Sequence, residues 1–168
     1  MTKTLDLQDY LPYLLNSCAL RMVDSFTPEL RGFGISLAMW RSLAALHHDG
    51  AMRLGELAQL TSIEISTLSR TVATLHRRGL VRRDRSDRDA RAVCVELTED
   101  GRALTERIIP LALRCEASAL ADFAPEDGAR LRQLLRRLFA NLTVTKVARV
   151  PHVPAAASTD RPETGPAS

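Results

Sequence analysis

Hydrophobic positions in the first part of the chain recur every three or four residues, which is helical spacing. The pattern predicts one helix from residue 5 to 26, interrupted after it by Thr27-Pro28, and a second from residue 36 to 48, stopped by Asp49-Gly50. On the second helix, one predicted face carries Leu37, Trp40, Ala44 and His47. Both segments therefore predict amphipathic helices with one face in a core.

Two shorter helices follow in quick succession, over 54–60 and 64–78, and Gly79 ends the second of them. The spacing of the longer helix places one apolar stripe toward the core, made of Ile65, Leu68, Val72 and Leu75. Its opposite face is small, hydroxylated and cationic, and consists of Ser66, Thr67, Arg70, Ala73, Thr74 and Arg77.

The pattern changes to strand-like alternation over 81–85 and 92–97, with a polar turn over 86–90. These segments predict a β-hairpin with a charged tip. A long helix is predicted from Thr98, a suitable N-cap, to about residue 123. A last helix starts at Pro125, and its apolar stripe consists of Leu131, Leu134, Leu135, Leu138 and Leu142.

This order of elements predicts a mainly α fold with a small β-hairpin, of the α+β class. A helix, a short helix, a turn, a longer helix and a hairpin are the layout of a winged helix-turn-helix, here over residues 36–97. Residues 5–26 and 98–143 supply N- and C-terminal helices, so residues 1–143 are expected to form one domain. The stretch 144–168 is rich in proline and poor in large apolar residues, which predicts a disordered tail.

Positive charge is concentrated in one segment of the chain. The formal net charge is only +3, yet residues 70–91 hold eight arginines and three acids, a local excess of +5. A contiguous basic segment is typical of proteins that bind polyanions. A solvated charged face is the other interpretation of the same composition.

The composition and the absence of certain motifs argue against several other classes of protein. Apolar residues at 45% suit a globular protein, and no apolar run reaches the length of a membrane span, so we expect a cytoplasmic protein without membrane partners. Cys18, Cys94 and Cys115 have no spacing typical of disulfide frameworks or zinc sites. No common hydrolase, metalloprotease or nucleotide-binding motif occurs, so the sequence predicts no enzyme, catalytic residue, metal site or cofactor.

Double-stranded DNA is the expected partner of the polar helix face and the hairpin. The major groove admits one helix, where hydroxyls can meet phosphates or base edges and arginine can bind guanine with two hydrogen bonds. The hairpin tip can reach an adjacent minor groove. The residues predicted to contact DNA are Ser66, Thr67, Ser69, Arg70, Thr74, Arg77, Arg88 and Arg91.

Several ordered motifs resemble the MarR family of transcriptional regulators. They are Leu54-Gly55-Glu56-Leu57-Ala58, Ser66-Thr67-Leu68-Ser69-Arg70, Arg78-Gly79-Leu80-Val81, Asp89-Ala90-Arg91, and Val95-Glu96-Leu97-Thr98 with Gly101. The resemblance covers roughly residues 5–142. It implies a homodimer built from the first helix and the last two helices, which reads a pseudo-palindromic operator. It also implies that Asp89 orients Arg91 into the minor groove, and that the protein is a ligand-responsive repressor or, less often, an activator.

The resemblance further implies a small-molecule effector, commonly an aromatic acid, bound between the dimerisation helices and the DNA-binding part. A carboxylate needs a cation or hydrogen-bond donor beside an apolar wall. The candidate residues are Arg21, Trp40, Arg41 and His47. We therefore expect a repressor of a neighbouring catabolic or efflux operon that an aromatic acid or phenolic compound releases from DNA.

Two alternatives stay open. Some relatives sense oxidants through a cysteine near the start of the first helix, and Cys18 is the nearest candidate, although its predicted place on an apolar face favours an unreactive thiol. The other alternative is a protein-interaction module without enzymatic activity, which would have no need of the cationic helix face.

Excess apolar surface on the last two helices favours a homodimer over a larger internal core.

Overall fold

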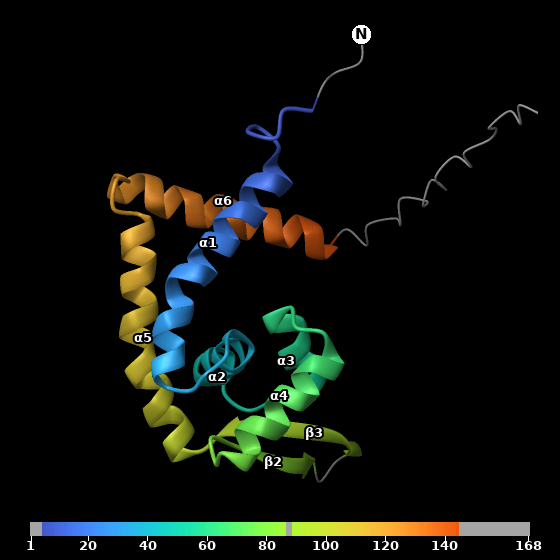
Figure 1. Ribbon diagram of the computed structural model, residues 1–168. Helices are drawn as coiled ribbons and strands as arrows, with labels where there is room; N and C mark the ends of the chain where they lie inside the picture. Colours follow the sequence, from blue (N-terminus) through green and yellow to red (C-terminus); the bar gives the residue numbers. More distant parts are fainter. Residues whose placement is uncertain (1–4, 87–88, 145–168) are drawn as a thin grey trace, which may run out of the picture. The chain divides into compact units, whose positions relative to one another are not determined.

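The computed structural model describes residues 5–86 and 89–144, with side chains described over 5–83 and 94–142. These residues form six helices and a three-stranded sheet, which confirms the predicted mainly α fold with a hairpin (Figure 1). In chain order the elements are α1 (Leu11–Gly32), α2 (Leu37–Asp49), β1 (Met52–Arg53), α3 (Leu54–Thr61), α4 (Ile65–Arg77), β2 (Val81–Ser86), β3 (Asp89–Leu97), α5 (Glu99–Ala119) and α6 (Pro125–Val144).

Internal contacts divide the chain into two units. The first ends at Ala121 and holds α1 to α5 with the sheet, and the second begins at Asp122 and holds α6. In the first unit, apolar side chains from all five helices and the sheet form one core. Its fully buried members include Leu30, Leu43, Leu57, Leu68, Leu75, Val95 and Ile108.

Helix α1 has the predicted length of 22 residues but lies six residues further along the chain. It starts at Leu11, with Pro12 in the first turn, and runs through Pro28 to Gly32, so the predicted start at residue 5 and the predicted end near residue 26 are both wrong. Proline has a helical φ and costs an interior helix mainly the hydrogen bond that its missing N–H cannot donate. Phe26 and Leu30 lie in the core on either side of Pro28, and their burial holds the helix across it.

Helix α2 matches the predicted bounds to within one residue but buries a different face. Its N-cap is Ser36, whose Oγ accepts a hydrogen bond from the Met39 amide at 3.2 Å. The fully buried side chains are Met39, Ser42, Leu43 and Leu46, whereas the predicted face of Leu37, Trp40, Ala44 and His47 is half-buried. The two faces adjoin, and tertiary packing rather than the local pattern decides which of them is central.

The hairpin is confirmed, and it belongs to a sheet with an additional strand. The antiparallel order is β1-β3-β2, with Met52 opposite Val95 and Val81 opposite Leu97. Strand β1 has two residues, too few to show alternation in the sequence. Across β2 and β3, the Arg82 guanidinium lies 2.6 Å from the Glu96 carboxylate. Figure 1 shows the hairpin beside the C-terminal half of α4.

Helix α5 starts where the sequence predicts and is tied to the end of α4. The Thr98 hydroxyl accepts from the Gly101 amide at 3.0 Å and donates to the Gly79 carbonyl at 2.6 Å. Gly101 lies against the Leu80 carbonyl, with no room for a side chain between the two backbones. The helix ends at Ala119, four residues before the predicted end at 123.

Helix α6 carries the predicted apolar stripe, and much of that stripe is exposed in the single chain. Of its predicted members, Leu131, Leu134, Leu135 and Leu142 are 37–59% exposed and Leu138 is half-buried. Phe139, which was not predicted to belong to the stripe, is 62% exposed. No helix in the described part of the chain combines the length and apolar character needed to cross a membrane.

Candidate nucleic-acid interface and the adjoining pockets

Glu64 organises the beginning of α4. Its carboxylate caps the helix by accepting hydrogen bonds from the amides of Ser66 at 2.8 Å and Thr67 at 3.1 Å, and from the Ser66 hydroxyl. The hydrogen bond from the Ser66 side chain, followed by those from the two amides, lowers the pKa of Glu64. The first turn of α4 is thereby held rigid and keeps its negative charge at neutral pH.

The polar face of α4 points away from the core, as the sequence predicts. Ser66, Thr67, Ser69, Arg70 and Arg77 are exposed, Thr74 is half-buried, and Leu68, Val72 and Leu75 are buried on the other side. The prediction is wrong for Ile65: its spacing places it in the buried stripe, but its side chain is 53% exposed. It occupies the first helical position, where the chain has not yet packed onto the core.

Hydrogen bonds within α4 divide the predicted DNA contacts into two groups. Thr74 donates to the Arg70 carbonyl at 3.0 Å and accepts from the Arg77 guanidinium at 2.9 Å, so these groups orient each other. Ser66 is bound to Glu64. Ser69 and Arg70, by contrast, form no side-chain hydrogen bond or ion pair with the described residues. Their polar atoms are therefore available to a ligand on this face.

A shallow pocket of about 290 Å³ adjoins this face, between α4 and the start of α2. It is lined by Ser36, Met39, Thr67, Arg70, Thr71 and Thr74. Hydroxyls and one guanidinium thus surround a small hollow beside the exposed face of α4.

The predicted wing contacts are only partly covered by the structure. Arg88 lies outside the described residues. Asp89 and Arg91 belong to β3, but their side chains are also outside the described part. On β2, Arg83 is exposed and Arg82 is paired with Glu96.

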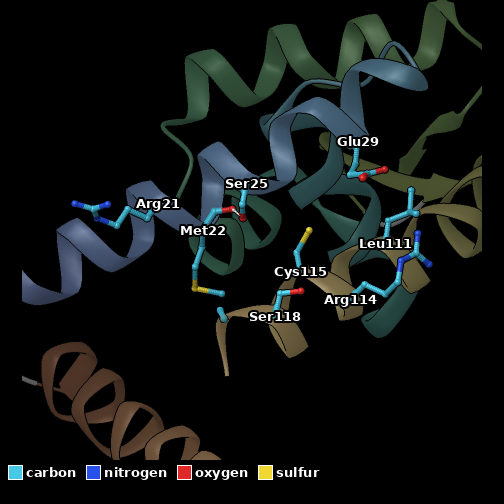
Figure 2. A pocket seen from close by; sticks show the side chains of 9 residues that line it. Arg21, Met22, Ser25, Glu29, Leu111, Arg114, Cys115 and Ser118 are labelled. Atoms are coloured by element: carbon cyan, nitrogen blue, oxygen red, sulfur yellow. Dashed lines mark hydrogen bonds between the residues drawn. The ribbon is translucent and has the colours of Figure 1, made fainter. Parts of the chain in front are cut away.

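A second site lies between α1 and α5, both in the first unit. A pocket of about 570 Å³ is lined by Arg21, Met22, Ser25, Glu29, Leu111, Arg114, Cys115, Ser118 and Ala119. Figure 2 shows the α1 side chains on one side and those of α5 on the other. In Figure 2 the Arg21 side chain extends away from the other labelled side chains, and Glu29 adds a carboxylate to the lining. Arg114, beside apolar and sulfur-containing side chains, can bind a small carboxylate with an apolar body.

A neighbouring pocket of about 340 Å³ extends toward α2 and shares Met22 and Cys115 with the first. Trp40 and Arg41 line it, and the Trp40 ring meets Phe26 edge to face with centroids 5.6 Å apart. The structure thus places three of the four predicted effector residues at two adjoining pockets, with Arg21 in one and Trp40 and Arg41 in the other.

His47 lines neither of these pockets. Its Nε2 lies 3.6 Å from a Glu106 carboxylate oxygen, between α2 and α5. Arg114, Met22 and Cys115 are pocket residues that the sequence analysis did not identify. The pattern along α5 indicates only an apolar face, and the residues opposite α1 become apparent only when the two helices are packed together.

The cysteines differ from expectation in one respect. Cys18 is exposed on α1, so its expected burial is wrong for the single chain, whereas Cys94 and Cys115 are half-buried. Within residues 5–86 and 89–144, no three His, Cys, Asp or Glu side chains gather in a way that could hold a metal ion.

Comparison with known proteins identifies the relatives of this fold. The MarR family model matches residues 35–93. A MarR-family transcriptional regulator from Silicibacter pomeroyi DSS-3 is 35% identical, with a TM-score of 0.72 over 83% of this chain and 99% of that one. Bordetella bronchiseptica BpsR, whose DNA binding is regulated by 6-hydroxynicotinic acid, is 27% identical, with a TM-score of 0.73 over 81% of this chain and 97% of that one.

A curated relative, the organic hydroperoxide resistance transcriptional regulator of Bacillus subtilis, is 24% identical over 81% of this chain and 89% of its own length. The helix-turn-helix geometry, the family model and a relative above 30% identity that is covered almost completely all agree. The chain therefore belongs to the MarR family of helix-turn-helix transcriptional regulators, which bind DNA and act as dimers.

Proposed function

We propose that this protein is a repressor that reads a pseudo-palindromic operator with the exposed face of α4 and leaves it when a small aromatic acid binds between α1 and α5. The observation that carries the DNA-reading part is the outward face of α4, which is hydroxylated and cationic over its whole length. Its one acid, Glu64, is occupied as a helix cap. The operon it would control is expected to be a neighbouring catabolic or efflux operon.

Arg70 is the central residue of the proposed interface. It lies in the second turn of α4, next to Ser69 and Thr67, and its guanidinium forms no hydrogen bond or ion pair with a described neighbour. Arginine discriminates guanine through paired hydrogen bonds to O6 and N7 in the major groove. Ser66, Thr67, Ser69 and Arg77 flank it and would contact phosphates or base edges. Thr74, whose hydroxyl accepts from the Arg77 guanidinium, would mainly orient Arg77.

Replacing Arg70 by alanine should weaken operator binding by about 1 to 3 kcal/mol per half-site and relax the preference for one base pair. The measurement is a fluorescence-anisotropy titration with duplexes that the wild-type protein has selected from a random library. Arg83→Ala is the matched control, because Arg83 is an exposed arginine on β2 and should mainly lower the salt dependence. Unchanged affinity and selectivity in Arg70→Ala would show that another surface reads the operator.

The wing residues belong to the same proposal. Arg88 and Arg91 would enter the minor groove, where a narrow groove concentrates negative potential, and Asp89 would orient Arg91. These roles rest on the family resemblance and the position of the hairpin.

The effector part of the proposal rests on the two adjoining pockets. Arg114 supplies a cation, Arg21 lies at the edge of the same pocket, and Trp40 with Phe26 supplies an apolar wall. A ligand there would contact α1 and α5, two of the expected dimerisation helices, and α2, which packs against α4. The ligand can weaken DNA binding only if it binds more tightly to the arrangement of these helices that does not fit the operator than to the arrangement that does. BpsR, whose DNA binding is regulated by 6-hydroxynicotinic acid, supports this class of ligand.

Titration with 6-hydroxynicotinate, nicotinate, salicylate and benzoate should reveal at least one compound that raises the melting temperature and weakens operator binding by 5- to 150-fold. Arg114→Ala should abolish this response while leaving DNA binding without ligand unchanged. Arg132→Ala, on α6 and outside both pockets, is the control. If none of the compounds changes either quantity, the aromatic-acid proposal is wrong.

Oxidant sensing is a second candidate, favoured by the exposure of Cys18 and by the likeness to a regulator of organic hydroperoxide resistance. Cumene hydroperoxide would then release the wild-type protein from DNA but not Cys18→Ser. The Cys94→Ser and Cys115→Ser variants separate a Cys18 response from a general loss of folding after oxidation. A response that persists in Cys18→Ser excludes this candidate.

A further inference from the structure

Arg78 is part of the basic segment, but its side chain faces the protein's own backbone. It is the C-cap residue of α4, the last position before the chain turns at Gly79 into β2. Its Nη1 donates to the Gly34 carbonyl at 2.7 Å, and its Nη2 donates to the Phe33 carbonyl at 3.3 Å. These acceptors are 44 and 45 residues away in sequence.

The two acceptors lie in the short turn between α1 and α2. Gly34 has a φ of +64°, and the turn is closed by the amides of Gly34 and Ile35, which donate to the carbonyls of Arg31 and Leu30. Carbonyls at a helix end receive no hydrogen bond from the helix itself. The planar guanidinium of Arg78 reaches the carbonyl of the C-cap residue Phe33 and the next carbonyl, of Gly34, at once, which a lysine ammonium does less well.

The same turn is also contacted from α5. The Arg107 guanidinium carbon lies 5.3 Å from the centre of the Phe33 ring, a cation–π distance. Phe33 is therefore contacted both by Arg107 from α5 and by Arg78 from the end of α4, and Gly34 by Arg78. These contacts join the end of α4 to the α1–α2 turn and join that turn to α5.

We propose that Arg78 is a positioning residue for operator reading, which sets the orientation of α4 through the α1–α2 turn and neutralises no DNA phosphate. The proposal rests on the proposed reading of DNA by α4. Arg78 is engaged in the DNA-free protein, so using it for a phosphate would break two hydrogen bonds that hold the reading helix. Its contribution is then to specific binding, where the geometry of α4 matters, and not to the electrostatic attraction shared by all duplexes.

The test compares Arg78→Ala, Arg78→Lys and Arg83→Ala in the full chain. The probes are a duplex that the wild-type protein has selected from a random library and an unrelated duplex of the same length. Affinities are measured at several salt concentrations, and thermal unfolding of each variant identifies any that fails to fold.

Arg78→Ala and Arg78→Lys are both expected to bind the selected duplex about tenfold more weakly, with the salt slope and the affinity for the unrelated duplex unchanged. Lysine keeps the charge but loses the paired hydrogen bonds, so it should not rescue binding. Arg83→Ala should lower the salt slope by about 0.9, the value for one phosphate contact.

The opposite pattern overturns the proposal. If Arg78→Lys binds like the wild type and Arg78→Ala loses about one unit of salt slope on both duplexes, Arg78 is a phosphate contact. If Arg78→Ala weakens both duplexes equally and also lowers the folded fraction, its role is general stability. Failure of the wild type to select any duplex would instead count against the proposed DNA reading itself, so the two failures are distinguishable.

Discussion

Replacing Gly101 by alanine should destabilise the protein by about 3 kcal/mol or more, the largest effect that we expect from a change of one methyl group. A Cβ at this position would lie 1.9 Å from the Leu80 carbonyl oxygen and 2.9 Å from its carbonyl carbon. Both are backbone atoms, so no side chain can move aside. Thr98 fixes the distance further, since its amide donates to the same Leu80 carbonyl at 3.2 Å.

Gly55→Ala is the matched control, because Gly55 is also helical and its Cβ would meet nothing within 4 Å. It should be neutral or slightly stabilising, as alanine favours a helix over glycine. Both variants are compared with the wild type by urea unfolding at one protein concentration, since the stability of a dimer depends on concentration. Equal stability of Gly101→Ala and the wild type would show that α5 does not approach Leu80 so closely.

Leu135→Asp should convert the dimer into monomer or aggregate. Leu135 lies in the exposed apolar stripe of α6, where it is 40% exposed in the single chain. We propose that this stripe is buried in the dimer. An unpaired carboxylate there would cost at least about 2 kcal/mol per chain. Because a twofold interface contains the residue twice, the total of about 4 kcal/mol corresponds to a dimer about 1000-fold weaker.

Gln133→Asp introduces the same charge on the opposite face of α6 and should leave the dimer intact. Light scattering and sedimentation at micromolar concentration distinguish the species. DNA binding by Leu135→Asp should fall with dimerisation, because two reading helices must meet major grooves about one helical turn apart. A Leu135→Asp protein that remains a dimer would place the interface elsewhere.

Much of the fold was predictable because its signals are local. A helix cap needs only a suitable side chain next to the first turn, and α5 begins where its predicted cap Thr98 places it. Helix α2 begins at Leu37, within one residue of its predicted start. The polar face of α4 was also predictable, since helical periodicity alone separates Arg70 from Leu68. The family could be identified because its motifs lie in these local elements.

The errors arose where a local signal competed with packing. Pro28 predicts a break, but burial of Phe26 and Leu30 carries α1 across it. Ile65 fits the apolar stripe of α4 by spacing, yet it lies at the helix end that the core does not reach. Strand β1 is too short to show a pattern and exists because β3 offers it an edge.

By itself, then, the sequence determined the helices, the hairpin, the basic reading face and the family, because these depend on periodicity, caps and motifs within about twenty residues. Only the tertiary structure decided which of the exposed arginines are bound to other parts of the protein. Arg70 is available to a ligand, whereas Arg78 binds carbonyls 44 and 45 residues away and Arg82 pairs with Glu96 across the hairpin. The tertiary structure alone also showed that Arg114 and Cys115 of α5 line one pocket with Arg21 of α1. Such contacts depend on chain segments far apart in sequence, and no local pattern encodes which of them will meet.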